Sequence, residues 1–136
     1  MKNKMILDKY TQPIYVPKDL YVCVNPNFNK LKTLFKFADD YDIERDFKGS
    51  NGMTFYLIKN VKEDRLCILV ILNMESLSEY DTDQAINTIA HEAFHVAHET
   101  LSYCGVEFTA NANEAYAYFI GWAAQCIYKT YIKTKK

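Results

Sequence analysis

Leu66-Cys67-Ile68-Leu69-Val70-Ile71-Leu72 is the stretch of sequence that decides the fold class. Every side chain in it is apolar, which is typical of a β-strand with both faces covered by other elements. The stretch Met53–Ile58 indicates a second strand, and the polar run Lys59–Arg65 between the two predicts a hairpin. Such a hairpin needs further elements to bury its faces, and we therefore expect an α+β domain.

Helical spacing of apolar residues predicts three helices around this hairpin. The first spans Asn27–Ala38, and the last runs from about Ala112 to Ile132. The middle helix is the longest, since it can begin at a cap on Ser78 or Asp81 and continue until Gly105 stops it. Its predicted core stripe consists of Ile86, Ala90, Phe94, Ala97 and Leu101.

The N-terminal part of the chain contains β-rich pieces around Ile14–Val16 and Leu20–Val24, which are separated by prolines. The coarse order of elements is therefore β-β-α-β-β-α-α. A chain of 136 residues has the length of one ordinary domain, so we expect a single domain over residues 1–136.

Composition and charge exclude several classes of protein. Apolar residues make up 49% and charged residues 24%, which argues against disorder. The net charge of -1 gives no global attraction to nucleic acid or to anionic lipid, so neither is expected as a partner. The distribution of charge is uneven: the segment between Arg65 and Lys129 has no Lys or Arg, but eight acids and all three histidines. A segment of this kind is suited to binding a cation. The alternative interpretation is an acidic surface on a helical hairpin that arose by chance.

We find no pattern of a signal peptide, of a membrane span or of a C-x-x-C pair in the sequence. The N-terminus lacks the apolar core of a signal peptide, and no stretch is long enough to span a bilayer comfortably. The four cysteines form no C-x-x-C pair and sit among apolar or aromatic neighbours. We therefore expect reduced core thiols in a cytoplasmic protein.

His91-Glu92-Ala93-Phe94-His95 matches the pattern H-E-x-x-H. Residues four apart lie on adjacent turns of one helical face, with Cβ atoms about 5–6 Å apart, so both imidazoles can bind one Zn²⁺ ion. Glu92 is rotated by about 100° from His91. Its carboxylate can accept a proton from a water activated by the metal. The alternative is that His91 and His95 are ordinary histidines of a helix surface.

Glu114 is the candidate third ligand, because a catalytic zinc needs three protein ligands and an open position. It lies nineteen residues after His95. A turn near Gly105 would bring the last helix back antiparallel to the first, with an early residue level with His95. The alternative role for Glu114 is a capping box with Asn111.

His91–His95 followed by Asn113-Glu114-Ala115-Tyr116-Ala117-Tyr118 resembles the gluzincin branch of zinc metallopeptidases. The chain is also similar to small zincin-like proteins encoded by bacteriophages and prophages. The resemblance covers roughly residues 81–128. It implies a zincin-like fold, with a small sheet above the active-site helix, and hydrolysis of peptide bonds. The roles it implies are metal ligation by His91, His95 and Glu114, and general-base catalysis by Glu92.

The sequence departs from this family in one respect. Larger gluzincins hold the oxyanion with a downstream histidine, and this chain has none after His98. Tyr118 lies four residues after Glu114 on the same helical face, so it is the candidate donor, with a buried core tyrosine as the alternative. The metzincin pattern, with Gly at position 98 and His at 101, is absent. Peptide deformylases use an upstream cysteine, but Cys67 lacks the Gly-rich motifs of that family. We expect His98 itself to be an exposed residue beside Glu99.

The leading prediction from these features is a small soluble zinc-dependent metallopeptidase that acts on a peptide or protein substrate. Glu92 would serve as general base, and an edge strand of the Met53–Leu72 hairpin would align an extended peptide. The alternative is a catalytically inactive, metal-stabilised protein that binds a host or phage partner.

Overall fold

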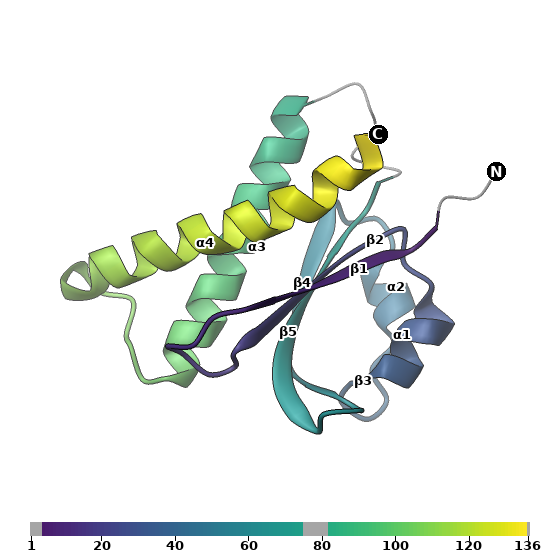
Figure 1. Ribbon diagram of the computed structural model, residues 1–136, viewed down its shortest axis with the longest axis horizontal. Coiled ribbons are helices and arrows are strands. Elements are labelled where there is room, and N and C mark those ends of the chain that lie inside the picture. The colour runs from purple at the N-terminus through teal and green to yellow at the C-terminus, as the bar shows by residue number, and fades with distance from the viewer. Residues whose placement is uncertain (1–3, 75–81, 136) are drawn as a thin grey trace.

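A five-stranded mixed sheet with the order β1-β2-β5-β4-β3 forms the centre of the molecule (Figure 1). The computed structural model describes residues 4–74 and 82–135. The strands are β1 (Ile6–Thr11), β2 (Asp19–Val24), β3 (Phe35–Lys36), β4 (Gly52–Asn60) and β5 (Arg65–Leu72). β2 pairs with β5 in parallel, and the other three neighbouring pairs are antiparallel. The α+β class is confirmed, and β4 and β5 form the predicted hairpin.

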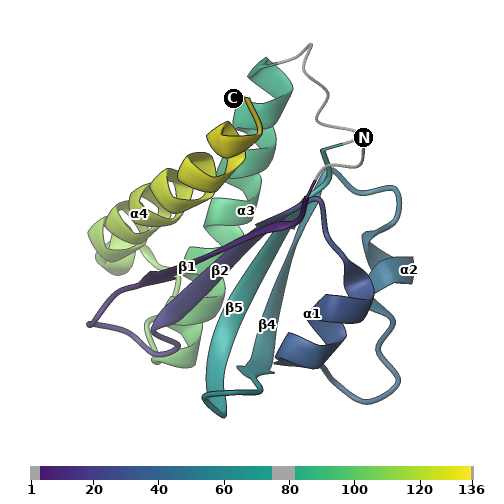
Figure 2. The ribbon, with the colours of Figure 1, turned by 45° about the vertical axis from the view of Figure 1, so that its right-hand side comes forward.

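Helices cover both faces of this sheet (Figures 1 and 2). The short helices α1 (Phe28–Leu34) and α2 (Ile43–Phe47) lie against one face. The long helices α3 (Thr82–Tyr103) and α4 (Asn113–Tyr131) lie against the other, with short 3-10 turns at Ala110–Ala112 and Ile132–Lys135. α4 returns in the opposite sense to α3 but crosses it obliquely, so its first turns lie away from the middle of α3 (Figures 1 and 2).

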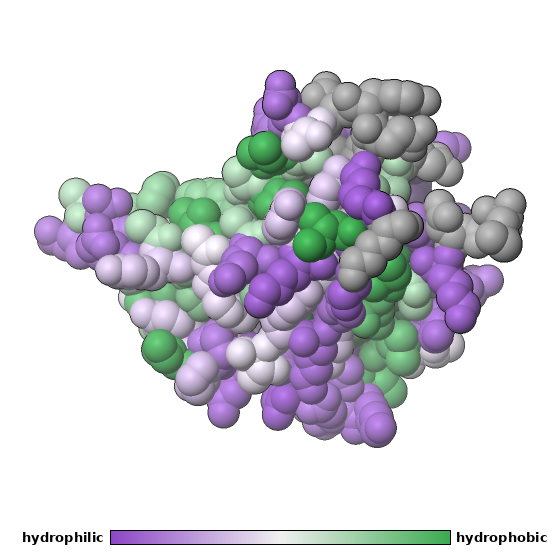
Figure 3. Space-filling model, turned by 45° about the horizontal axis from the view of Figure 1, so that its top comes forward, coloured by the Kyte–Doolittle hydropathy of each residue, from purple (hydrophilic) through white to green (hydrophobic). Residues whose placement is uncertain are grey.

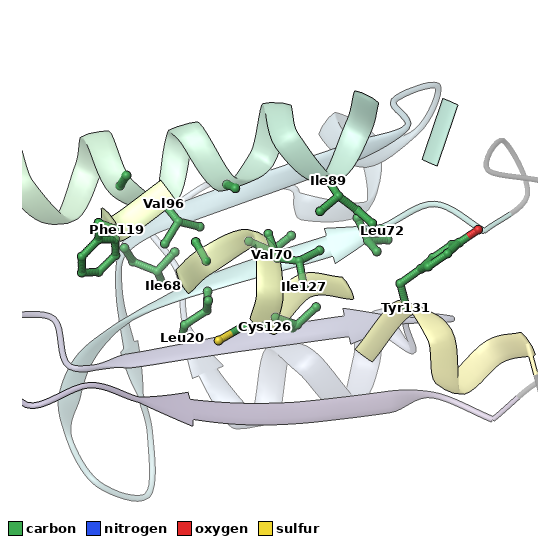
Figure 4. Close-up of a cluster of buried hydrophobic side chains, with 14 of the residues drawn as sticks. Leu20, Ile68, Val70, Leu72, Ile89, Val96, Phe119, Cys126, Ile127 and Tyr131 are labelled. Atoms are coloured by element: carbon green, nitrogen blue, oxygen red, sulfur yellow. The ribbon is translucent and has the colours of Figure 1, made fainter. Parts of the chain in front are cut away.

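The strand β5 divides its side chains between two hydrophobic cores. Ile68, Val70 and Leu72 point to the core under α3 and α4, where Figure 4 shows Leu72 near Ile89 and Ile68 near Phe119. The alternate side chains Cys67, Leu69 and Ile71 belong to the core under α1 and α2. Because successive side chains of a strand point to opposite faces, the uninterrupted apolar sequence reflects burial on both sides, as predicted.

The long helix α3 ends where the sequence predicted. Gly105 adopts a φ of 82°, which is a left-handed conformation that glycine reaches without a steric penalty. The backbone N–H of Val106 then donates to the carbonyl of Leu101 at 2.8 Å, which satisfies a terminal carbonyl of the helix. The two predicted N-caps, Ser78 and Asp81, lie outside the described residues.

The N-terminal elements differ from the sequence prediction. Ile14–Val16 lies in the loop between β1 and β2, and the strand comes earlier, at Ile6–Thr11. The helix predicted over Asn27–Ala38 ends at Leu34, because Phe35 turns into β3 and pairs with β4. Pairing between segments distant in the sequence has overridden the local helical pattern here.

The buried face of α3 agrees with the predicted core stripe at its C-terminal end, where Ala97 and Leu101 are fully buried, but not at its N-terminal end. Ile86 is 59% exposed and Ala90 is also exposed, whereas Ile89 and Ala93 are buried. The sheet therefore packs on a neighbouring side of the helix. One consequence is that Glu92 lies on the buried side and is only 4% exposed.

The outer edge of β4 is open along most of the strand. β3 is only two residues long and pairs with Lys59 and Asn60, so within the described chain no strand pairs with Gly52–Tyr56 on that side. This part of β4 lies against α3. A Cβ atom on Gly52 would lie 3.1 Å from Thr88 Cγ2 and 3.2 Å from Glu92 Cγ, so the absence of a side chain permits the close approach.

The face of the molecule that includes α4 has hydrophobic residues scattered among hydrophilic ones (Figure 3). Across residues 4–74 and 82–135, no helix is both long enough and apolar enough to cross a membrane.

Candidate functional site

His91 and His95 lie on adjacent turns of α3, and both rings are on its exposed side. Their Nε2 atoms are 3.1 Å apart, and their ring centroids are 4.8 Å apart. Two nitrogens bound to one tetrahedral zinc ion at about 2.0–2.1 Å each would be about 3.3 Å apart. The two imidazoles therefore have close to the spacing that a shared divalent ion requires. In the absence of a metal, this spacing also permits a hydrogen bond between the neutral rings.

Glu92 places a carboxylate beside this pair of histidines. Its Oε1 accepts a hydrogen bond of 2.7 Å from the hydroxyl of Thr54 on β4. Its Oε2 lies 3.9 Å from Nε2 of His91. Among the described residues, no Lys or Arg forms an ion pair with Glu92. Thr54 thus fixes one oxygen of a buried carboxylate, and the other oxygen faces the imidazoles.

A surface hollow of about 350 Å³ gives access to these groups. Its lining includes Gly52, Thr54, Tyr56, His91, Glu92 and His95. A second hollow of about 270 Å³ shares Gly52, His91 and Glu92 with it and extends toward the N-terminal half of α3. The site is therefore an open seam between α3 and the free edge of β4.

Glu114 and Tyr118 lie on the outward side of α4, and neither lines this hollow. Both are exposed, Tyr118 by 76%. The physical reason is helical geometry: Tyr116 is 1% exposed and its ring lies 6.4 Å from that of His98 on α3. Residues two positions before and after Tyr116 are rotated by about 200° from it and face solvent. The last helix does return in the opposite sense, as predicted, but Glu114 is exposed and lies outside the hollow at His95.

His98 belongs to a different environment from the other two histidines. Its ring stacks on Phe94 with an interplanar angle of 20°, and Phe108 and Tyr116 complete an aromatic cluster. Its Nδ1 lies 3.5 Å from Glu99 Oε1, as the neighbouring positions suggested. His98 therefore packs in this cluster and is less exposed than predicted.

The cysteines take no part in the site. Cys67 is fully buried in the core under α1 and α2, on the opposite face of the sheet from His91, which removes it as a ligand. Burial raises the pKa of the Cys23 and Cys67 thiols to about 12 and that of Cys126 to about 11. All four cysteines are free, but Cys104 is exposed, so the expectation of core thiols is confirmed for the other three.

No protein-family model, curated protein or solved structure matches this chain. In addition, residues 4–74 and 82–135 contain no group of three His, Cys, Asp or Glu side chains placed to hold a metal ion. The assignment to gluzincin-type and phage-encoded zincin-like proteins is therefore wrong. The pattern H-E-x-x-H brought two imidazoles and a carboxylate together, but the second motif did not join them.

Sequence reasoning missed Thr54 and Gly52, which position Glu92. Thr54 lies in the predicted strand Met53–Ile58 and Gly52 directly precedes that strand; residues two apart in a strand share one face. This alternation could have placed them on the same side of β4. It could not have shown that α3, rather than solvent, lies on that side.

Proposed function

We propose that this protein is a hydrolase of peptide bonds that uses a divalent metal ion, with Zn²⁺ as the first candidate. The observation that carries the proposal is the grouping of a buried carboxylate, held by a hydroxyl, with two imidazole nitrogens 3.1 Å apart. Buried carboxylates are costly unless they are paired, and such groups are concentrated at functional sites. Imidazole nitrogens are suitable ligands for Zn²⁺.

His91 and His95 would supply two ligands through Nε2, and water would fill the other positions, because no third His, Cys, Asp or Glu of the described residues is placed to join them. The open hollow beside them would admit water and substrate. The bound ion would polarise the scissile carbonyl and make water acidic enough to deprotonate near neutral pH. Glu92 would accept the proton of the attacking water at Oε2 and deliver it to the leaving amine. The Thr54 hydroxyl would keep Oε1 fixed, so that Oε2 faces the reacting atoms.

The free edge of β4 supports a peptide as the substrate. No strand of the described residues pairs with Gly52–Tyr56 on this edge, and Gly52, Thr54 and Tyr56 line the hollow. An extended peptide could add to this edge as a further strand, which would bring its own carbonyl groups past His91 and Glu92. Main-chain pairing of this kind is independent of peptide sequence, so it suits a chemistry directed at the peptide bond.

The test compares the wild-type chain with Glu92→Gln, each prepared without metal and then supplied with one equivalent of Zn²⁺. We expect the wild type to cleave a mixture of unstructured peptides only after addition of Zn²⁺, and Glu92→Gln to be slower by at least about a hundredfold. Zn²⁺ binding measured by calorimetry should be retained in Glu92→Gln.

Glu107→Gln is the matched control, because Glu107 is an exposed acid that lies in the loop after α3. Its activity should equal that of the wild type. Equal cleavage by wild type and Glu92→Gln would refute the role of the carboxylate. Retention of Zn²⁺ without any cleavage would instead favour the metal-stabilised binding protein.

A further inference from the structure

A third hollow continues the seam past the candidate site. It has a volume of about 210 Å³ and shares Tyr56 and Glu99 with the hollow at His91 and His95. Its apolar walls are Pro17, Tyr56, Leu57, Ile68 and Tyr103. These side chains come from the β1–β2 loop, from β4, from β5 and from the C-terminal turn of α3, so four separate segments build the hollow.

Leu57 has an unusual backbone conformation at the rim of this hollow. Its φ is 56°, a left-handed value that is rare for a bulky residue, and the register of β4 against β5 shifts between Phe55 and Ile58. The irregularity leaves Tyr56 and Leu57 exposed by 49% and 62%. Backbone strain of this kind persists where the surrounding structure enforces it, and it is concentrated at binding sites.

The floor and the rim of the hollow differ in exposure. Ile68 at the floor is 2% exposed, whereas Tyr56, Leu57 and Tyr103 at the rim are about half exposed or more. An apolar side chain that entered the hollow would contact the buried Ile68. It would also cover the three exposed side chains at the rim. A polar side chain would gain little there, because within the described residues the lining is apolar apart from Glu99, Ser102 and the hydroxyl groups of the two tyrosines.

We propose that this hollow, continuous with the candidate site, binds one bulky apolar side chain of an extended peptide that pairs with the free edge of β4. The inference rests on the proposed function and gives it a substrate class. Leu57 lies three residues after Thr54, which is about 10 Å along a strand. The apolar residue would therefore sit two or three positions from the peptide bond that faces Glu92, always on the same side of that bond.

The test measures binding separately from cleavage. Full-length Glu92→Gln, without added metal, is titrated with two capped hexapeptides of Gly, Ser and Thr that carry either one Leu or one Asn at the same position. Backbone amide shifts by NMR report both affinity and location. We expect the Leu peptide to bind about tenfold more tightly than the Asn peptide, with the largest shifts at Tyr56, Leu57 and Tyr103.

Two variants at the rim and one control define the site. Leu57→Asp should remove the tenfold preference, and Leu57→Gly should reduce it while relieving the left-handed conformation, so that folding is not at risk. Val61→Asp is the matched control, because Val61 is 54% exposed in the same hairpin but lines no part of the hollow. It should leave the preference unchanged.

Equal affinities of the two peptides, no detectable binding of the Leu peptide, or shifts confined to other surfaces would overturn the proposal. Cleavage of peptides by the wild type without any preference for Leu would overturn this inference alone. Preference for Leu in binding, without cleavage by the Zn²⁺-supplied wild type, would overturn the proposed hydrolase and leave the apolar hollow in place.

Discussion

Asp19 and Glu92 are the two buried acids of the described chain, and their surroundings are opposite. Asp19 is 2% exposed and accepts hydrogen bonds from Arg65 at 2.6 Å and from Thr11 at 2.8 Å. Glu92 is 4% exposed and accepts from Thr54, but no Lys or Arg of residues 4–74 and 82–135 pairs with it. One carboxylate is neutralised by its own chain, whereas the other faces two imidazoles and a hollow.

The difference separates a carboxylate neutralised within the fold from the one to which we assign a role in the proposed site. Burial by itself raises the pKa of Asp19, but the hydrogen bonds from Arg65 and Thr11 and the charge of Lys9 outweigh it, so the pKa is lowered. This arrangement contributes to stability and offers nothing to a ligand. Among the described residues no Lys or Arg neutralises Glu92, and its Oε2 lies 3.9 Å from Nε2 of His91, where the proposed metal ion would supply the positive charge.

The largest expected effect is on binding of the metal ion that we propose beside Glu92. His91→Ala and His95→Ala should each weaken Zn²⁺ binding by about a hundredfold or more, since each removes one of two nitrogens from the site. His98→Ala should leave the affinity unchanged, because that ring lies in the aromatic cluster with Phe94. Isothermal titration calorimetry gives the affinities. If His98→Ala weakened Zn²⁺ binding as much as His91→Ala, the distinction between the proposed metal site and the aromatic cluster would be wrong.

The next effect is on stability and contrasts the two acids directly. Asp19→Asn should lower the free energy of unfolding at pH 7 by about 2–3 kcal/mol, because the charged hydrogen bonds from Arg65 are lost. Glu92→Gln should change it by less than about 1 kcal/mol or stabilise the protein, as substitutions at functional sites often do. Urea unfolding followed by circular dichroism measures both. The opposite order would mean that Glu92 is the structural acid.

The pH dependence sharpens the same contrast. Because the pKa of Asp19 is lower in the folded protein than its ordinary value of 3.8, its contribution to stability is complete above that value. The contribution disappears as the pH falls through the lower, folded-state pKa. The stability gap between wild type and Asp19→Asn should therefore be constant at neutral pH and shrink below about pH 4. A gap that is unchanged at pH 3 would contradict the assigned role of the ion pair.

The smallest effect tests how Glu92 is held. Thr54→Val keeps the shape of the side chain but removes the hydroxyl that donates to Oε1, and it should cost about 1–2 kcal/mol of stability. Thr54→Ser retains the hydroxyl and should recover much of this loss. Thermal unfolding of the three proteins provides the measurement. Equal stability of the Val and Ser variants would show that the hydrogen bond does not contribute.

Local sequence patterns predicted those parts of the fold that depend on neighbouring residues. The strand β5, its hairpin partner and the end of α3 at Gly105 all follow from patterns within about twenty residues. The early end of α1 at Leu34 does not, because it depends on the pairing of Phe35 with β4. The strand β1 was missed for another reason, since its partner β2 follows closely in the sequence. Helical patterns in Asn27–Ala38 could not reveal that Phe35 would join β4.

The candidate site also has features that local sequence determines and features that only tertiary packing determines. The sequence by itself determined that His91 and His95 meet, because a separation of four residues on a helix places them on adjacent turns. Only the tertiary structure decided that Glu92 is buried against Thr54 and that Glu114 faces solvent. Those outcomes depend on which side of α3 meets the sheet and on how α4 crosses it. Helix packing of this kind is set by the fit of whole surfaces, which no short motif encodes.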